Sequence, residues 1–184
     1  MDRVDALVSV YRSQLALPWK QGLSGPERVW IAVYPPDIER RLRVRLPEFE
    51  IATKDAKRRW RHLDLTSAFA DWLAAQEYRE AYFEDPDAIK PALQGFAKTL
   101  DATIRAALSA ADVDAETVVA ISGVGALFPM VRVSDVIQRA ASDIRGRLLI
   151  FFPGTYEHGN YRLLDARDGW NYLAIPITIP EGAS

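Results

Sequence analysis

Apolar side chains recur every three or four residues along several segments of the chain, which is the spacing of amphipathic helices. We expect the helix over 38–46 to stop near Pro47, because proline has no amide hydrogen for the helical hydrogen bonds. Thr66 is the expected N-cap of a later helix. In all, the pattern predicts helices over 3–16, 38–46, 87–111 and 133–144, and one that follows Thr66 and is interrupted at 84–87.

Other segments are almost continuously apolar, as expected of strands that are buried on both faces of a sheet. These segments are 28–34, 117–122, 148–152 and 172–179, and Pro176 places the last one at a sheet edge. The more polar segment 59–65 is expected to pair with 48–53. Because buried strands alternate with amphipathic helices, the sequence predicts an α/β fold, with a three-layer, mostly parallel sheet flanked by helices in a single domain over 1–184.

Composition narrows the possible functions. The 184 residues carry a formal charge of −2, so the chain as a whole has no strong field for nucleic acid or an anionic membrane. The chain has no cysteine, which excludes disulfides, thiolate metal sites and cysteine nucleophiles and fits a reducing compartment. No apolar stretch has the length of a signal peptide or a membrane span. We therefore expect a cytoplasmic protein with no membrane partner and no strong direct contact with nucleic acid.

Arginines gather in the stretch 40–61. One interpretation is direct contact with DNA phosphates. The other is a solvated helix face, because Glu39, Glu48, Glu50 and Asp55 are interleaved with the arginines, and the sequence favours this second interpretation.

A glycine loop is the best candidate for a phosphate site. Gly123-Val124-Gly125 follows a predicted strand, where ligands of α/β sheets gather, but it lacks the third glycine and the lysine of the nucleotide-binding motifs. A plain turn between a strand and a helix is the favoured interpretation. A degenerate nucleotide-binding or hydrolytic α/β protein that uses the crevice near Gly123–Gly125 remains the alternative function.

Signals of catalysis and of metal binding are weak. Ser122, His158 and Asp165 could form a triad, but the sequence has no G-x-S-x-G motif. The other histidine, His62, lies in a strand pattern and is expected to be half-buried and structural, whereas His158 is expected on the surface. We expect no catalytic residue and no cofactor, and hence no enzymatic activity.

The carboxylates of one acidic segment are the remaining metal candidates. They are expected to form a solvated helix face and a helix cap rather than a metal site. These residues are Glu77, Glu80, Glu84, Asp85 and Asp87.

The segment 151–177 alternates charged residues with large aromatic ones. Tyrosine, tryptophan and arginine are common anchors at protein interfaces, but the charged residues could instead pair locally and fix a long loop on its own sheet. Stacking on nucleic acid bases is a third interpretation, which the near-neutral charge disfavours. The candidate partner-binding residues are Tyr156, Tyr161, Arg162, Asp165, Arg167, Asp168, Trp170 and Tyr172.

The same segment carries a family resemblance. The chain resembles the BrxB family of BREX phage-resistance systems in Phe152-Pro153-Gly154-Thr155-Tyr156 and in the residues from Tyr161-Arg162-Leu163-Leu164 to Trp170-Asn171-Tyr172-Leu173-Ala174. Upstream, the similarity extends to Gly123-Val124-Gly125-Ala126-Leu127-Phe128-Pro129, to Trp72-Leu73-Ala74-Ala75-Gln76-Glu77-Tyr78-Arg79 and to Leu17-Pro18-Trp19.

The resemblance implies a small cytoplasmic component of a bacterial defence system. Such systems combine a BrxC-like ATPase, a PglZ-like protein of the alkaline-phosphatase type and a PglX-like DNA methyltransferase, and these proteins are the implied partners. The family supplies no catalytic residues to transfer. Together with the absence of catalytic signatures and the aromatic and arginine residues of 154–172, the resemblance favours a non-catalytic assembly subunit that docks larger BREX proteins, with the PglZ-like protein as the direct partner.

Overall fold

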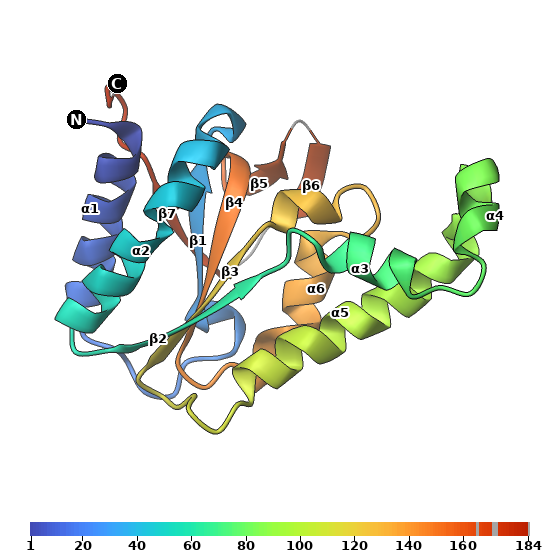
Figure 1. Cartoon of the computed structure of the whole chain (residues 1–184). Coiled ribbons are helices and arrows are strands. Elements are labelled where there is room, and N and C mark those ends of the chain that lie inside the picture. Colours follow the sequence, from blue (N-terminus) through green and yellow to red (C-terminus); the bar gives the residue numbers. More distant parts are fainter. Residues whose placement is uncertain (165, 171–172, 184) are drawn as a thin grey trace.

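The computed structural model describes residues 1–164, 166–170 and 173–183. In this part of the chain, parallel strands form a sheet in the order β2–β3–β4–β1–β7 (Figure 1). Their bounds are β1 (Val29–Tyr34), β2 (Arg59–Asp64), β3 (Thr117–Ser122), β4 (Arg147–Glu157) and β7 (Ile175–Thr178). The predicted α/β fold with a mostly parallel sheet is confirmed.

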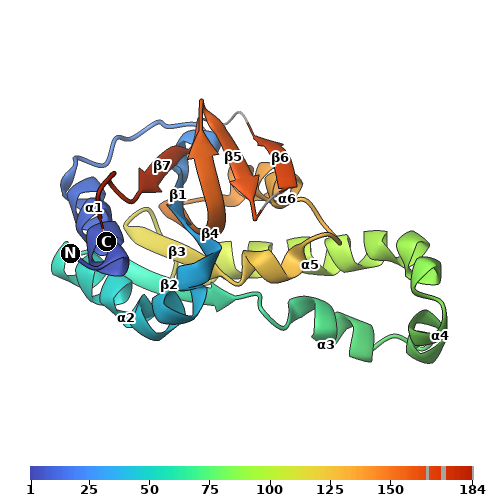
Figure 2. The same cartoon turned by 90° about the horizontal axis from the view of Figure 1, so that it is seen from above.

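Helices cover both faces of this sheet (Figures 1 and 2). One face packs against α1 (Arg3–Ala16) and α2 (Glu39–Asp55), and the other against α5 (Leu93–Leu108) and α6 (Val133–Ala140). Every residue of β1 and of β3 is buried, which agrees with their continuous apolar sequences. Burial of each large apolar side chain contributes about 1.5–3 kcal/mol, so the two cores fix the sheet between its helices.

The far end of β4 leaves the parallel sheet and forms an antiparallel extension. It pairs with β5 (Asn160–Leu163), and β5 pairs with β6 (Ala166–Trp170). The predicted strand at 148–152 is thus longer than expected, because β4 continues through Pro153 and Gly154 to Glu157.

A second extension, which we call the arm, is formed by residues 67–92. It contains α3 (Ala68–Ala74), α4 (Arg79–Glu84) and the 3-10 helix η3 (Pro86–Ala92). Figure 2 shows α4 far from the sheet, at the end of the arm and beyond the start of α5. None of the residues of α3, α4 and η3 is buried. The tip of the arm, residues 77–90, therefore has no core of its own.

Two predictions around Pro47 are wrong. The helix does not stop at Pro47, because α2 continues to Asp55, and the segment 48–53 is therefore helical and not a strand. Pro47 is exposed, whereas Phe49 and Thr53 pack into the core on the other side of the helix. This packing outweighs the cost of a proline inside a helix, which is about 3 kcal/mol. The segment 59–65 does form β2, but β2 pairs in parallel with β3.

Helix boundaries near the arm also differ from the prediction. Ser67 occupies the N-cap of α3, and the Thr66 hydroxyl instead donates to Asp64. The helix expected from residue 87 begins as η3 and becomes α-helical only at Leu93. The predicted edge position of the last strand is confirmed, since β7 is at the end of the sheet order.

Short 3-10 helices connect the remaining elements. They are η1 (Pro26–Arg28), η2 (Pro36–Ile38), η4 (Val124–Leu127) and η5 (Ala141–Asp143). None of the described helices is long and apolar enough to cross a membrane.

Candidate functional site

The parallel strands end at one edge of the sheet, which we call the carboxyl edge, and ligands of open α/β sheets bind beyond this edge. A cavity of about 260 Å³ lies there. It is formed by η2 and the start of α2, by the turns after β2 and β3, by Pro153 within β4 and by Leu164 after β5. Its lining residues are Pro36, Glu39, Arg43, Thr66, Gly123, Gly125, Ala126, Pro153 and Leu164.

The charged groups of this cavity are paired with one another. Nε of Arg43 lies 3.2 Å from a carboxylate oxygen of Glu39, and its Nη2 lies 3.6 Å from Asp64 and donates to the Thr66 hydroxyl. Burial alone would raise the pKa of Asp64, but the hydroxyl and amide of Thr66 and the charge of Arg43 together lower it. One cation therefore faces two carboxylates, which disfavours the binding of a phosphate.

The glycine loop is shaped by close packing. Gly123 has a φ of +79°, and a Cβ at this position would lie 2.5 Å from the amide nitrogen of Thr66. The segment that follows, η4, is a short 3-10 helix, and α6 begins only at Val133. These features favour the interpretation of Gly123-Val124-Gly125 as a plain turn.

A histidine and a serine do meet at the carboxyl edge, but they are not the pair considered from the sequence. Nε2 of His62 lies 2.8 Å from Oγ of Ser122, across the parallel pair β2 and β3. His62 is more exposed than the expected half-buried residue, whereas Ser122 is only 3% exposed. A serine so deeply buried is inaccessible to a substrate, so the hydrogen bond serves to join the edge strand β2 to β3.

His158, the histidine of the triad considered above, is an exposed residue in the turn between β4 and β5, as expected. Asp165 lies outside the described residues. The sequence does not predict the His62–Ser122 contact, because the contact depends on the pairing of 59–65 with 117–122.

The acidic residues of the arm include the expected helix cap. Asp85 accepts a hydrogen bond from the amide of Asp87 at the start of η3, and Asp87 pairs with Lys90. All five acidic candidates from Glu77 to Asp87 are exposed. Within the described ranges, no group of three or more potential metal ligands is found.

The arginines of 40–61 form ion pairs, which supports the interpretation as a solvated face. Arg45 contacts both Glu48 and Asp5, and Arg41 contacts Asp2. On and next to β2, the pairs are Arg58–Glu116, Arg59–Asp114 and Arg61–Asp112.

In the C-terminal segment the structure separates buried from exposed candidates. Tyr161 is 1% exposed and donates a hydrogen bond to the carbonyl oxygen of Ala174 (3.2 Å), and its ring centroid lies 4.7 Å from that of the partly buried Tyr156. Burial raises the pKa of Tyr161 well above its usual value. Arg162, the next residue, is exposed and lies opposite Thr155 on β4. Tyr161 thus holds the extension on the core, and Arg162 faces solvent.

For three other candidates of this segment, the structure describes only the backbone. Arg167, Asp168 and Trp170 lie on β6, where the structure describes the backbone. Asp165 and Tyr172 lie outside the described residues.

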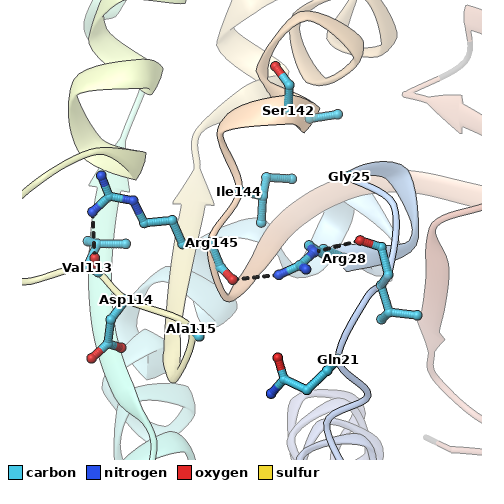
Figure 3. Close-up of a pocket in the computed structure, with 11 residues that line it drawn as sticks. Gln21, Gly25, Arg28, Val113, Asp114, Ala115, Ser142, Ile144 and Arg145 are labelled. Carbon is cyan, nitrogen blue, oxygen red and sulfur yellow. Dashed lines mark hydrogen bonds between the residues drawn. The ribbon is translucent and has the colours of Figure 1, made fainter.

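The opposite edge, where the parallel strands begin, is the amino edge. A cavity of about 600 Å³ lies there, between η1 and the segments that precede β3 and β4 (Figure 3). Arg28 donates to the carbonyl oxygens of Leu23 (3.1 Å) and Arg145 (2.6 Å), and Arg145 donates to that of Val113 (2.9 Å). Both guanidinium groups therefore hold the walls of this cavity together.

Comparison with known proteins identifies the family. The family model described as BREX protein BrxB matches residues 61–177, which include most of β2, the arm, the glycine loop and the antiparallel extension with β5 and β6. Neither the comparison with curated proteins nor the comparison with solved structures gives a match. The matched part spans more than half of the chain, and the chain therefore belongs to the BrxB family of BREX phage-defence proteins.

Proposed function

We propose that the chain is a non-catalytic assembly subunit of a BREX complex, which docks larger components through protein–protein contacts, and that the PglZ-like protein is its direct partner. The BrxC-like and PglX-like proteins are further candidate partners. The observation that carries this proposal is the arm, whose tip presents aromatic side chains to solvent, far from the sheet (Figure 1).

The exposed aromatic residues of the tip are Tyr78 and Phe83, which are 66% and 69% exposed. Burial of a side chain of this size on a partner contributes about 1.5–3 kcal/mol, and aromatic anchors dominate many interfaces. A solvent-exposed arm with such residues, and with no buried residue in α4 or η3, is typical of a segment that completes its packing on another protein.

The base of the arm is firmly anchored. Phe69 and Trp72 of α3 pack on Phe96 of α5, with ring centroids 5.2 Å and 5.5 Å apart. Phe96 itself is 1% exposed and belongs to the core. The tip is thus held out from the body on a fixed base, which reduces the entropy lost when a partner binds.

The charge of the tip defines the partner surface that would fit it. Residues 77–90 carry five carboxylates but only two basic side chains, Arg79 and Lys90. An acidic, aromatic tip is complementary to a surface that combines apolar pockets with lysine or arginine side chains.

The C-terminal extension offers a second docking position. Arg162 is exposed on a strand whose neighbours Tyr161 and Leu163 are buried, so its backbone is fixed by the core. Arginine on such a support is a common interface residue. Because Tyr161 is buried, we assign it a supporting role and place the direct contact at Arg162.

Co-purification with the PglZ-like protein tests the proposal. We expect the double variant Tyr78→Ala/Phe83→Ala to reduce the captured PglZ-like protein about tenfold or more, and Arg162→Ala to reduce it less. The matched control is Val44→Ala, which removes an exposed apolar side chain (81% exposed) from α2, away from both surfaces. Undiminished capture by both test variants, with unchanged thermal unfolding, would contradict these docking surfaces.

A further inference from the structure

A second cavity at the amino edge, of about 470 Å³, contains a cation that is buried without a carboxylate partner. The cavity lies between the end of α1, the loop that follows it and the first residues of β1, β4 and β7. Its lining residues are Gln14, Leu17, Pro18, Trp19, Lys20, Leu23, Glu27, Trp30, Arg147, Leu173 and Ile175.

Arg147, the first residue of β4, lines this cavity and is only 5% exposed. Its Nη1 donates to the carbonyl oxygen of Gly146 at 2.9 Å, and no described carboxylate forms an ion pair with it. Burial and the positive charges of Arg28 and Arg58 lower its pKa from the usual value. Burial of an unpaired charge is costly, and an anion at this position would relieve the cost.

Trp19 supplies a second unused donor. Its indole Nε1 is shielded from solvent and has no hydrogen-bond partner among the described residues. The guanidinium of Arg147 lies 4.6 Å from the Trp19 ring, and the ring of Trp30 meets that of Trp19 edge-on at 5.7 Å. Buried polar groups are almost always hydrogen-bonded, so an empty donor beside a buried cation points to an acceptor that is supplied from outside the chain.

The rest of the lining sets the chemistry of that acceptor. The one acidic residue of the cavity, Glu27, already accepts hydrogen bonds from the amide and the hydroxyl of Ser24, at 2.8 Å and 2.7 Å. The rim is mainly apolar, with Leu17, Leu173 and Ile175 exposed by 55%, 66% and 36%, and its other polar side chains are Gln14 and the exposed Lys20. An apolar wall and a single buried guanidinium fit a singly charged anion on an aromatic or apolar body better than they fit inorganic phosphate.

We propose that this cavity binds a small organic carboxylate with an aromatic or apolar body. The carboxylate pairs with Arg147 and accepts the hydrogen bond of Trp19 Nε1, while the body lies against Trp30 and the apolar rim. This inference concerns the isolated chain and does not depend on the docking function proposed above.

Calorimetric titration of the full chain tests this site. The probes are indole-3-acetate, its neutral analogue indole-3-acetamide, and inorganic phosphate. We expect saturable binding of the carboxylate, and affinities about tenfold or more weaker for the amide and for phosphate, because neither satisfies Arg147 within an apolar pocket. Equal binding of the amide, tighter binding of phosphate, or no binding of the carboxylate would overturn the proposal.

Variants locate the binding within the fold. Arg147→Met removes the cation with little change of volume, and Trp19→Phe removes only the indole donor and part of the wall; each is expected to weaken indole-3-acetate binding, the first about tenfold or more. The matched control is Arg12→Met, which removes an exposed arginine that pairs with Asp55, and it is expected to bind as the unmodified chain does. If Arg147→Met does not fold, the Trp19→Phe variant still decides, since unchanged affinity in that variant would contradict the assigned hydrogen bond.

Discussion

The two edges of the sheet each contain an arginine, and the two arginines differ in burial and in the charges around them. At the carboxyl edge, Arg43 is partly exposed and faces the carboxylates of Glu39 and Asp64. At the amino edge, Arg147 is buried and the cations Arg28 and Arg58 lower its pKa, while Glu27 in the same cavity is hydrogen-bonded to Ser24. The edge at which α/β proteins usually bind their ligands has its charges satisfied within the chain, whereas the opposite edge has a charge left to satisfy.

The difference follows from how the chain enters and leaves the strands. Beyond β2 and β3 the chain turns tightly, so that Gly123, Thr66 and Asp64 are in close contact. Before β1, a long loop from Leu17 to Gly25 lies at the start of the sheet, and Trp19 of this loop lines the cavity there. The charge balance of the particular loops is therefore a better guide to a ligand site in this chain than the general rule for the fold class.

Gly123→Ala has the largest expected effect on this comparison. The new Cβ would lie 2.5 Å from the Thr66 amide nitrogen and 2.8 Å from Oδ1 of Asp64, in a residue with a φ of +79°. We expect the free energy of unfolding, measured by urea denaturation, to fall by about 3 kcal/mol, because both the backbone conformation and the close packing oppose a side chain.

Gly159→Ala is the control for the backbone conformation alone. Gly159 has a φ of +78°, but a Cβ there would meet no atom within 4 Å. Its cost is expected to be about 1 kcal/mol. Equal losses in the two variants would show that the carboxyl edge is not tightly packed at Gly123, and would reopen the loop as a phosphate site.

Charge removal at the two edges is expected to change stability in different directions. Arg43→Met leaves Glu39 and Asp64 without their cation, and the free energy of unfolding should fall by about 0.5–1 kcal/mol, the small value expected of pairs near the surface. Arg147→Met replaces an unpaired buried charge by an apolar chain of similar length, and stability should stay the same or rise by about 1 kcal/mol. Thermal and urea unfolding of both variants measure this contrast, and a larger loss for Arg147→Met than for Arg43→Met would contradict it.

The sequence predicts the elements whose local pattern and packing agree. The bounds of α1 are those expected, because Val4, Leu7 and Tyr11 form one apolar stripe and a proline follows the helix closely. β3 agrees as well, since it is buried on both faces. α2 was mispredicted because Pro47 is a local signal, whereas the burial of Phe49 and Thr53 is a property of the whole fold.

For the candidate site residues too, the local pattern predicts some features, and others depend on the whole fold. The alternation along β5 fits a buried Tyr161 beside an exposed Arg162, but only the structure shows which of the two faces the core. Arg147 stands just before the predicted strand at 148–152, and nothing nearby in the sequence indicates that it is buried. Its environment comes from Trp19, Trp30 and the start of β7, which are distant along the chain. Sites formed by loops from several strands depend on the sheet order, which the sequence does not reveal.

The smallest expected effect is a pH dependence at the carboxyl edge. Desolvation lowers the pKa of His62 below its usual 6.5, although the charges of Asp64 and Glu50 oppose this shift. The unfolded chain therefore binds a proton at a pH at which folded His62 is still neutral, so stability is lost as the pH falls through 6.5 toward the lower pKa of the folded state.

The two histidines of the chain allow a matched test. Urea denaturation from about pH 8 to about pH 5 should show a decline of stability that is shallower in His62→Gln than in the unmodified chain. His158→Asn, in the exposed turn after β4, should leave the decline unchanged, because asparagine tolerates its positive φ of 52°. Nuclear magnetic resonance titration of the two imidazole rings measures the pKa of His62 directly. A His62 pKa above 6.5 would mean that Asp64 and Glu50 outweigh desolvation, and the carboxyl edge would then gain stability on acidification instead of losing it.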